Sequence, residues 1–123
     1  LYFNIGIVNY NAKNIEQAEK YFAKAVEIKD DYPRGNWMLA NTILLRDADL
    51  VTKMNALPMS DTKGYAKYET ERKNLFNKVL PILIKADKAE RSASTVRLLV
   101  GVYEQLEMSD KATELRKVLE TLK

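Results

Sequence analysis

The 123-residue chain contains no cysteine and no histidine. Without cysteine it can form neither a disulfide bond nor a thiolate metal site. Without histidine it lacks the most common general base and a frequent metal ligand. It also lacks a glycine-rich phosphate loop. The carboxylate pairs Asp47 with Asp49 and Glu69 with Glu71 are each two residues apart, which places them on different faces of a helix and not in a catalytic pair. The sequence therefore predicts a protein that is not an enzyme, with no catalytic residue, no metal site and no cofactor.

Long apolar runs are missing as well. The longest, VLPILI at residues 79–84, is far shorter than the roughly 20 residues that span a bilayer, so we expect no membrane insertion of this segment. The 20 basic and 17 acidic residues alternate along the chain without forming a basic block. This alternation is typical of a solvated surface and predicts no nucleic-acid partner. Nothing in the composition indicates a cellular compartment.

Glycine and proline are scarce, with 4 and 3 residues. Between them apolar residues recur every three or four positions, which is the period of a helix and not of a strand. The sequence thus predicts one all-α domain. We expect its helices near residues 1–12, 14–29, 33–57, 62–90, 94–107 and 109–122.

Capping residues mark the predicted helix starts. Asn14 and Gln17 are spaced like a capping box, and Pro33 suits the first turn of the third helix. Either Ser92 or Ser94 is expected to cap the fifth helix. Ser109 with Asp110 is expected to cap the sixth.

The chain repeats itself at an offset of 34 residues. Phe3 then aligns with Trp37, Ile5 with Leu39, and the small Gly6 with the small Ala40. Within the first repeat Ala18, Phe22 and Ala25 lie at positions i, i+4 and i+7, so they share one helix face. The small residues allow close helix approach, and Phe22 fills the remaining space. This pattern predicts core packing.

These residues resemble the tetratricopeptide-repeat (TPR) family, whose helix pair reads W-x2-L-G-x2-Y and then A-x3-F-x2-A. The matching positions are Ile5, Gly6, Ala18, Phe22 and Ala25 in the first repeat, Leu39 and Ala40 in the second, and Leu99, Tyr103 and Ala112 in the third. In the third repeat Arg116 stands where the family has Phe. The resemblance implies a TPR-like superhelix, or solenoid, of about three helix pairs. Its repeats would cover residues 1–32, 33–91 and 92–123, the last including a capping helix.

The middle repeat is lengthened, as in several bacterial TPR proteins. Val100 follows Ala40 by 60 residues, 26 more than the 34-residue period. We expect both helices of this pair to continue into a projecting hairpin. The residues expected along its seam are Ala48, Val51, Asn55 and Leu57, facing Tyr65, Tyr68, Arg72, Leu75 and Val79. Whether Tyr65 and Tyr68 belong to the seam or to an interface stays open at this point.

The resemblance also implies a concave face lined by the first helix of each pair, where a peptide or helix of a partner protein would bind. The expected groove residues are Phe3, Ile7, Tyr10, Asn11, Trp37, Asn41, Leu44, Arg97 and Glu104. TPR proteins that clamp a C-terminal carboxylate have Lys and Asn where this chain has Phe3 and Ile7, so we expect no such clamp. Phe3 and Trp37 are expected to form a neighbouring aromatic pair that receives an apolar anchor.

The alternative is a structural role, as a spacer or oligomerisation module without a groove ligand. The chain begins directly in an apolar helical pattern with no capping residue, which predicts a C-terminal fragment of a longer protein. Phe3 and Trp37 would then pack against preceding repeats or a second copy, giving self-association through the N-terminal end. The last helix has the apolar Ala112, Leu115 and Leu122 on one face, as a terminal capping helix should.

Overall fold

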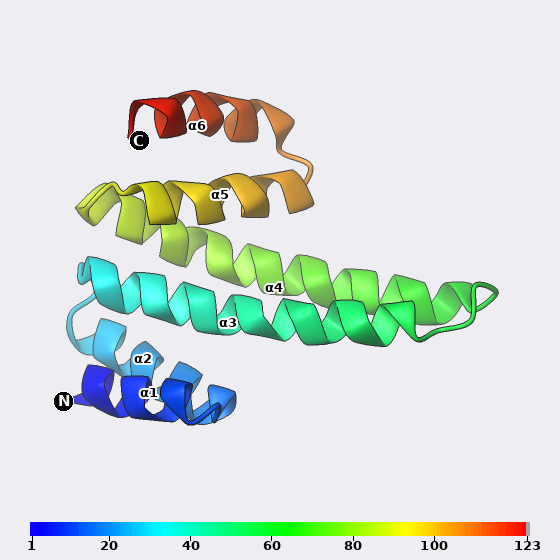
Figure 1. Ribbon diagram of the computed structural model, residues 1–123, viewed down its shortest axis with the longest axis horizontal. Helices are drawn as coiled ribbons and strands as arrows, with labels where there is room; N and C mark the ends of the chain where they lie inside the picture. The colour runs from blue at the N-terminus through cyan, green and yellow to red at the C-terminus, as the bar shows by residue number, and fades with distance from the viewer. Residues whose placement is uncertain (123) are drawn as a thin grey trace.

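The computed structural model describes residues 1–122, and within them it contains six α-helices and no β-strand. The helices are α1 (Tyr2–Asn11), α2 (Ile15–Ile28), α3 (Pro33–Asn55), α4 (Thr62–Ala89), α5 (Ala93–Gln105) and α6 (Ser109–Thr121), shown in Figure 1. The prediction of an all-α protein is confirmed. Every helix end lies within two residues of its predicted position.

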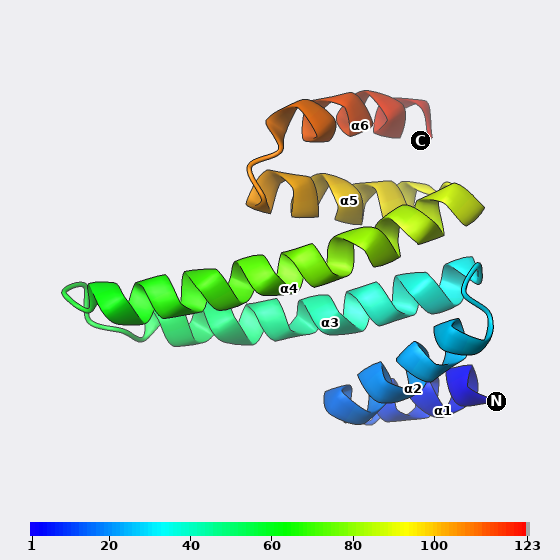
Figure 2. The same ribbon diagram turned by 180° about the vertical axis from the view of Figure 1, so that it is seen from behind.

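The helices are stacked in chain order, and each runs antiparallel to the one before it (Figure 1). Each helix packs against its neighbours in the sequence. The N-terminal and C-terminal helices therefore lie at opposite ends of the stack. α3 and α4, with 23 and 28 residues, are about twice as long as the other helices. They extend together beyond the body as a projecting hairpin (Figures 1 and 2).

Two of the predicted caps are formed, and two are not. The Ser92 hydroxyl accepts the Thr95 backbone N–H at 3.2 Å, and Pro33 begins α3. The capping box is wrong, because Asn14 occupies the N-cap position but its side chain makes no capping bond. Ser109 is the first helical residue and not the cap.

The reason for both corrections is a backbone turn that precedes α2 and α6. Lys13 and Glu107 adopt left-handed φ angles of 66° and 59°. The next N–H reaches back five residues, from Asn14 to the Asn9 carbonyl and from Met108 to the Tyr103 carbonyl, both at 2.8 Å. This is the Schellman arrangement that closes a helix C-terminus. The turn itself therefore sets the start of the following helix, without a side-chain cap.

The core runs through the stack as one cluster of buried apolar side chains. The most deeply buried large ones include Phe22, Ile43, Val79, Leu83 and Val96. Of the predicted repeat-motif positions, Gly6, Ala18, Phe22, Leu39, Ala40, Leu99, Tyr103 and Ala112 are buried, and Ile5 and Ala25 are half-buried. These small and aromatic positions thus hold neighbouring helices together, as expected from their spacing.

Gly6 shows why a small residue is needed at one of these positions. A Cβ atom added to Gly6 would lie 2.6 Å from the ring of Phe22, which is closer than real side-chain contacts. In the last pair, Val100 occupies the position that corresponds to Gly6, and Arg116 the position that corresponds to Phe22. Arg116 points away from the core and forms an ion pair with Glu104 at 3.0 Å.

The hairpin seam agrees with the prediction on α4 and differs on α3. Tyr65, Tyr68 and Arg72 are half-buried, and Leu75 and Val79 are buried, as predicted. On α3 the prediction of Ala48 and Asn55 is wrong because both are exposed, while Val51 and Leu57 are half-buried. The positions that follow buried Ile43 at helical spacing are Asp47, Leu50 and Met54, and these are half-buried in their place.

Tyr65 belongs to the hairpin seam. Its hydroxyl donates to the Leu57 carbonyl at 3.4 Å and so links the first turn of α4 to the end of the α3 segment. Beyond this bond, the tip of the hairpin exposes Met59 almost fully, at 93%.

Candidate functional site

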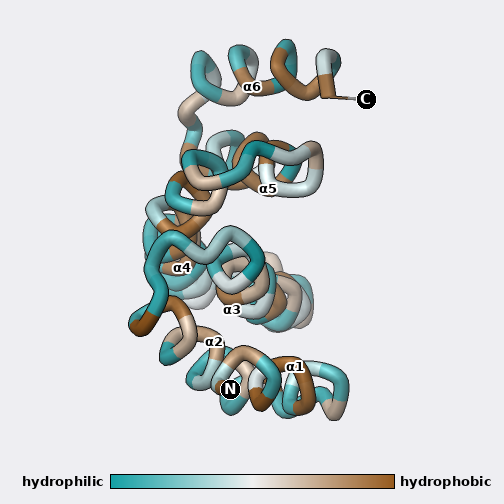
Figure 3. The backbone as a smooth tube through the Cα atoms, turned by 90° about the vertical axis from the view of Figure 1, so that its left-hand side faces the viewer, coloured by the Kyte–Doolittle hydropathy of each residue, from teal (hydrophilic) through white to brown (hydrophobic). Residues whose placement is uncertain are grey.

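The predicted groove residues come from α1, α3 and α5. Viewed roughly along the helix axes, α1 and α3 lie on one side, and α2 and α4 lie on the other (Figure 3). Phe3, Ile7, Tyr10, Trp37, Asn41 and Leu44 are half-buried, whereas Asn11, Arg97 and Glu104 are exposed. The half-buried apolar members also pack against the core. The predicted set therefore combines core support with partly accessible surface.

Tyr10 and Asn41 are brought into direct contact. The Asn41 side-chain amide of α3 donates a hydrogen bond to the Tyr10 hydroxyl of α1 at 3.0 Å. This bond joins the first helices of two successive pairs on the predicted face. It leaves the other amide hydrogen of Asn41 and the hydroxyl hydrogen of Tyr10 to donate elsewhere.

The expected pairing of Phe3 with Trp37 is wrong. The Phe3 ring instead contacts Phe22 and Tyr32, with ring centroids 5.5 Å and 5.2 Å away. Tyr32 lies in the α2–α3 connection, to which the buried Asn36 side chain is hydrogen-bonded. The Asn36 amide donates to the carbonyls of Asp30 and Tyr32 at 2.9 Å and 3.0 Å.

Trp37 lines a surface hollow of about 400 Å³ between the start of α3 and the start of α5. Its lining residues are Tyr32, Pro33, Arg34, Trp37, Glu90, Ser92, Ser94 and Thr95. The size is within the range of small-ligand sites. The indole Nε1 of Trp37 is buried and has no hydrogen-bond partner in residues 1–122. The hollow thus combines aromatic walls with hydroxyl groups and one basic and one acidic side chain.

The predicted groove residues on α5 are exposed, unlike most of those on α1 and α3. Arg97 is exposed. Glu104 is turned toward α6, where it accepts the ion pair from Arg116 at 3.0 Å. Between them Gly101 faces open space, since nothing lies within 4 Å of an added Cβ. These α5 residues therefore form a loosely packed part of the predicted face.

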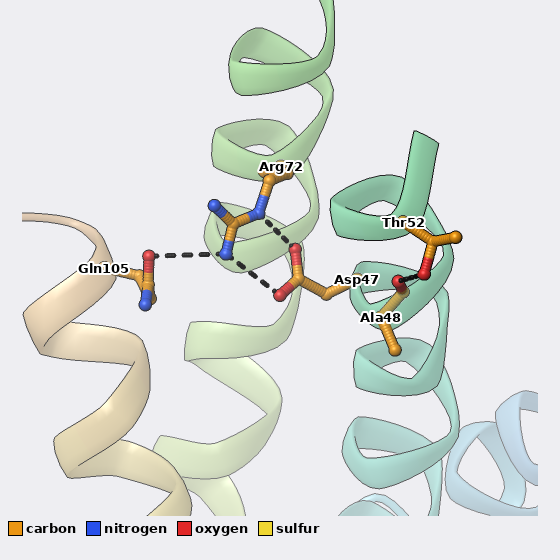
Figure 4. A network of polar contacts seen from close by, with 5 residues as sticks. All are labelled: Asp47, Ala48, Thr52, Arg72 and Gln105. Atoms are coloured by element: carbon orange, nitrogen blue, oxygen red, sulfur yellow. Dashed lines mark hydrogen bonds and ion pairs between the residues drawn. The ribbon is translucent and has the colours of Figure 1, made fainter. Parts of the chain in front are cut away.

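A polar network fixes the place where the hairpin leaves the body (Figure 4). The Arg72 guanidinium of α4 binds both carboxylate oxygens of Asp47 on α3, at 2.6 Å and 3.1 Å. The same guanidinium approaches the Gln105 side-chain oxygen of α5 at 3.5 Å. Its hydrogen bond to Asp47 raises the pKa of Arg72, which keeps the group charged. A bidentate pair of this kind fixes orientation as well as distance.

Several residues of this surface could not be found from the sequence. Tyr32, Glu90 and Thr95 line the hollow but belong to no repeated pattern. Ser92 gave a signal only as a helix cap. Asp47 stands next to the predicted seam residue Ala48, and only the rotation of α3 decides which of the two faces Arg72.

The described residues contain neither a cluster suited to a metal ion nor a helix suited to span a membrane. In residues 1–122, no group of three or more acidic side chains is arranged to hold a metal ion. Over the same range, no helix combines the length and apolar character needed to cross a membrane. Comparison with known proteins adds no family, because no family model matches the chain and no curated protein matches its sequence.

Proposed function

We propose that the six helices form three tetratricopeptide-like pairs, at residues 1–32, 33–91 and 92–123, arranged as a superhelix. Two features 94 residues apart support this proposal. The left-handed turn at Lys13 recurs at Glu107, and fully buried Ala18 recurs at Ala112. The lengthened middle pair accounts for the doubled helices α3 and α4.

The proposed function is that of a non-enzymatic scaffold that binds a peptide or helix of a partner protein on the face formed by α1, α3 and α5. The observation that carries this proposal is the hollow beside Trp37. Aromatic side chains in a partly enclosed pocket are typical anchors of protein interfaces. A partner would place an apolar side chain against Tyr32 and Trp37, with a polar group near the Ser94 hydroxyl.

The hollow can be tested by filling it from its rim. Ser94 is exposed near the start of α5, so Ser94→Trp should fill the hollow while leaving the core intact. Ser109→Trp is a matched control, because Ser109 is also an exposed serine in the first turn of a helix. Both variants should melt within a few degrees of the parent.

Partners captured from the source cell by the parent should be lost with Ser94→Trp and kept with Ser109→Trp. Each captured partner is then purified and titrated. Because Trp37 is the single tryptophan of the parent chain, a partner in the hollow should shift its emission and reduce quenching by acrylamide. Partners that bind Ser94→Trp as tightly as the parent would refute the proposal.

The alternative, an oligomerisation or spacer module, is favoured by one observation on α1. Residues 1–12 contain no charged side chain, and Leu1 and Val8 are 90% and 67% exposed. An uncharged helix face can pack against a second copy without charge desolvation. Light scattering distinguishes this role, because a dimer formed through α1 should dissociate in Val8→Lys while the partners captured through Trp37 remain bound.

A further inference from the structure

The solvent face of α4 carries a row of lysines, here called the basic stripe, which is interrupted by uncharged residues between Lys67 and Lys78. The exposed positions directly opposite its buried face are residues 63, 67, 70, 74, 77, 78, 81, 85 and 88, which follow one another at helical spacing. Five of these nine are lysines, namely Lys63, Lys67, Lys78, Lys85 and Lys88, and none is acidic. From Lys63 to Lys88 the stripe is about 38 Å long at 1.5 Å per residue.

No other helix has such a face. The exposed positions of α6 include both Lys111 and Glu114, and those of α2 include both Lys20 and Glu27; on α4 the one exposed acidic residue, Glu69, lies outside the nine stripe positions. α4 contains seven Lys and Arg residues against three Asp and Glu, a net charge of +4, whereas the whole chain carries only +3. The positive charge of this protein is therefore concentrated on one helix.

The stripe is not explained by ion pairs with the body of the protein. Lys78 pairs with Glu19 at 3.2 Å and Lys85 with Asp30 at 3.3 Å. Within residues 1–122, Lys63, Lys67 and Lys88 have no acidic partner among the ion pairs of the structure. Two of these three uncompensated lysines lie in the part of α4 that belongs to the projecting hairpin, away from the body (Figures 1 and 2).

Lys63 also occupies a position that is unfavourable for helix stability. It lies in the first turn of α4, which contains no acidic residue but is capped by Asp61, whose carboxylate accepts the Gly64 N–H at 2.9 Å. The positive end of the helix dipole repels a cation there. Lys67, one turn further on, adds repulsion between like charges at i and i+4. Both effects are worth only tenths of a kilocalorie per mole, and the carboxylates of Asp61 and Glu71 partly offset them.

We propose that this stripe is a docking surface for an acidic helix of a partner protein, whose carboxylates follow the same spacing of three to four residues. Charge complementarity carries the assignment, because a row of glutamates would neutralise the first-turn cation at Lys63 and the Lys63–Lys67 repulsion together. The stripe shares no residue with the Trp37 hollow, so failure at either surface leaves the other untouched.

Two other anions fit the stripe less well. Proteins that bind single-stranded nucleic acid add aromatic side chains on which bases stack, and the nine stripe positions contain no aromatic residue and no arginine. A helix that lies on a membrane buries an apolar face in the lipid boundary. The apolar residues of α4, such as Leu75, Val79 and Leu83, are already buried against the other helices.

The test uses a labelled helical peptide of about 25 residues, matched to the stripe length, with glutamate at every third or fourth position. A second peptide has glutamine at the same positions. Fluorescence anisotropy should show binding of the glutamate peptide alone, weakening as ionic strength rises toward about 0.15 M. Lys63→Glu with Lys67→Glu should reduce the affinity at least about tenfold.

The same double variant should melt within about 2 °C of the parent. Lys63→Glu places an anion at the helix N-terminus, whereas Lys67→Glu meets Glu71 at i, i+4, so the two effects oppose each other. A melting temperature in this range shows that lost binding does not come from unfolding. Lys111→Glu with Lys117→Glu is the control, because it changes the net charge equally on two exposed lysines of α6. It should retain most of the binding.

Three results would overturn the proposal. The glutamate peptide could bind no more tightly than the glutamine peptide, or the two double variants could lose affinity equally, which would reduce the effect to net charge. Alternatively, duplex DNA or vesicles containing phosphatidylserine could bind more tightly than the peptide and lose binding in the α4 variant. The stripe would then belong to a nucleic-acid or membrane surface.

Discussion

The first and last helix pairs have the same backbone plan but pack it in two different ways. In both, a left-handed residue ends the first helix and a fully buried alanine begins the contact of the second. In α1–α2, Gly6 makes room for the ring of Phe22. In α5–α6, the larger Val100 occupies the glycine position, and Arg116 leaves the core for an ion pair. The glycine and the aromatic position thus both differ between the two pairs.

The outer faces of the two pairs also differ. α1 exposes uncharged residues, among them Val8, whereas α6 exposes Lys111, Glu114 and Lys117. A charged outer face is suited to contact with water, and an uncharged one tolerates contact with protein. The turn and the buried alanine are thus common to both pairs, whereas the glycine position, the aromatic position and the outer face differ between them.

The largest expected effect concerns the equivalent positions Phe22 and Arg116, one of which is in the core and the other on the surface. Phe22→Ala removes a fully buried ring and should lower the free energy of unfolding by about 3–5 kcal/mol. Arg116→Ala removes an ion pair whose side chains are 50% and 49% exposed, so its cost should stay below about 1 kcal/mol. Urea denaturation measures both. Similar losses would show that the last pair depends on Arg116 for packing.

The next prediction compares two helical glycines. Gly6→Ala should destabilise the protein by about 1–3 kcal/mol, because the new methyl group meets the buried Phe22 ring. Gly101→Ala adds a methyl group to open space and should stabilise by about 0.5–1 kcal/mol through helix propensity. The two changes are chemically identical, so opposite shifts in melting temperature would isolate the effect of packing.

A double variant sharpens the same point. With Phe22→Ala already present, the ring that opposes Gly6→Ala is gone. In this background Gly6→Ala should no longer destabilise the protein. It should instead raise the free energy of unfolding by up to about 1 kcal/mol, through the higher helix propensity of alanine. A cost that persists in this background would place the obstacle in the backbone of α2 and not in the ring.

The sequence was sufficient to predict the helices and the buried repeat positions. Apolar spacing, Pro33 and the scarcity of glycine located all six helices to within two residues. Positions such as Ala18, Phe22 and Ala112 were recognised because close packing restricts their size. These features depend on local chemistry or on one strict geometric requirement, and both leave a visible pattern.

Contacts between elements could not be predicted in the same way. Ala48 is exposed and Asp47 half-buried because of how α3 is rotated against α4. Hydrophobic periodicity does not give this rotation. Tyr32 replaces Trp37 beside Phe3, and it lies in the α2–α3 connection, to which the Asn36 side chain is hydrogen-bonded. The basic stripe of α4 was not recognised from the sequence. Its lysines are separated along the chain by other residues, and they share one face only when the segment is helical.

The smallest expected effect tests whether the two turns are energetically equal. Lys13 and Glu107 both have left-handed φ angles, a conformation that costs little only for glycine. Lys13→Gly and Glu107→Gly should each stabilise by about 0.5–1 kcal/mol, after the loss from a more flexible unfolded chain. Lys13→Ala and Glu107→Ala keep the strain and remove the side chain, so they should bring no gain. Thermal melts of the four variants measure these effects. If glycine raised the melting temperature at one turn only, the two turns would not be energetically equal, and strain and packing would contribute differently at each.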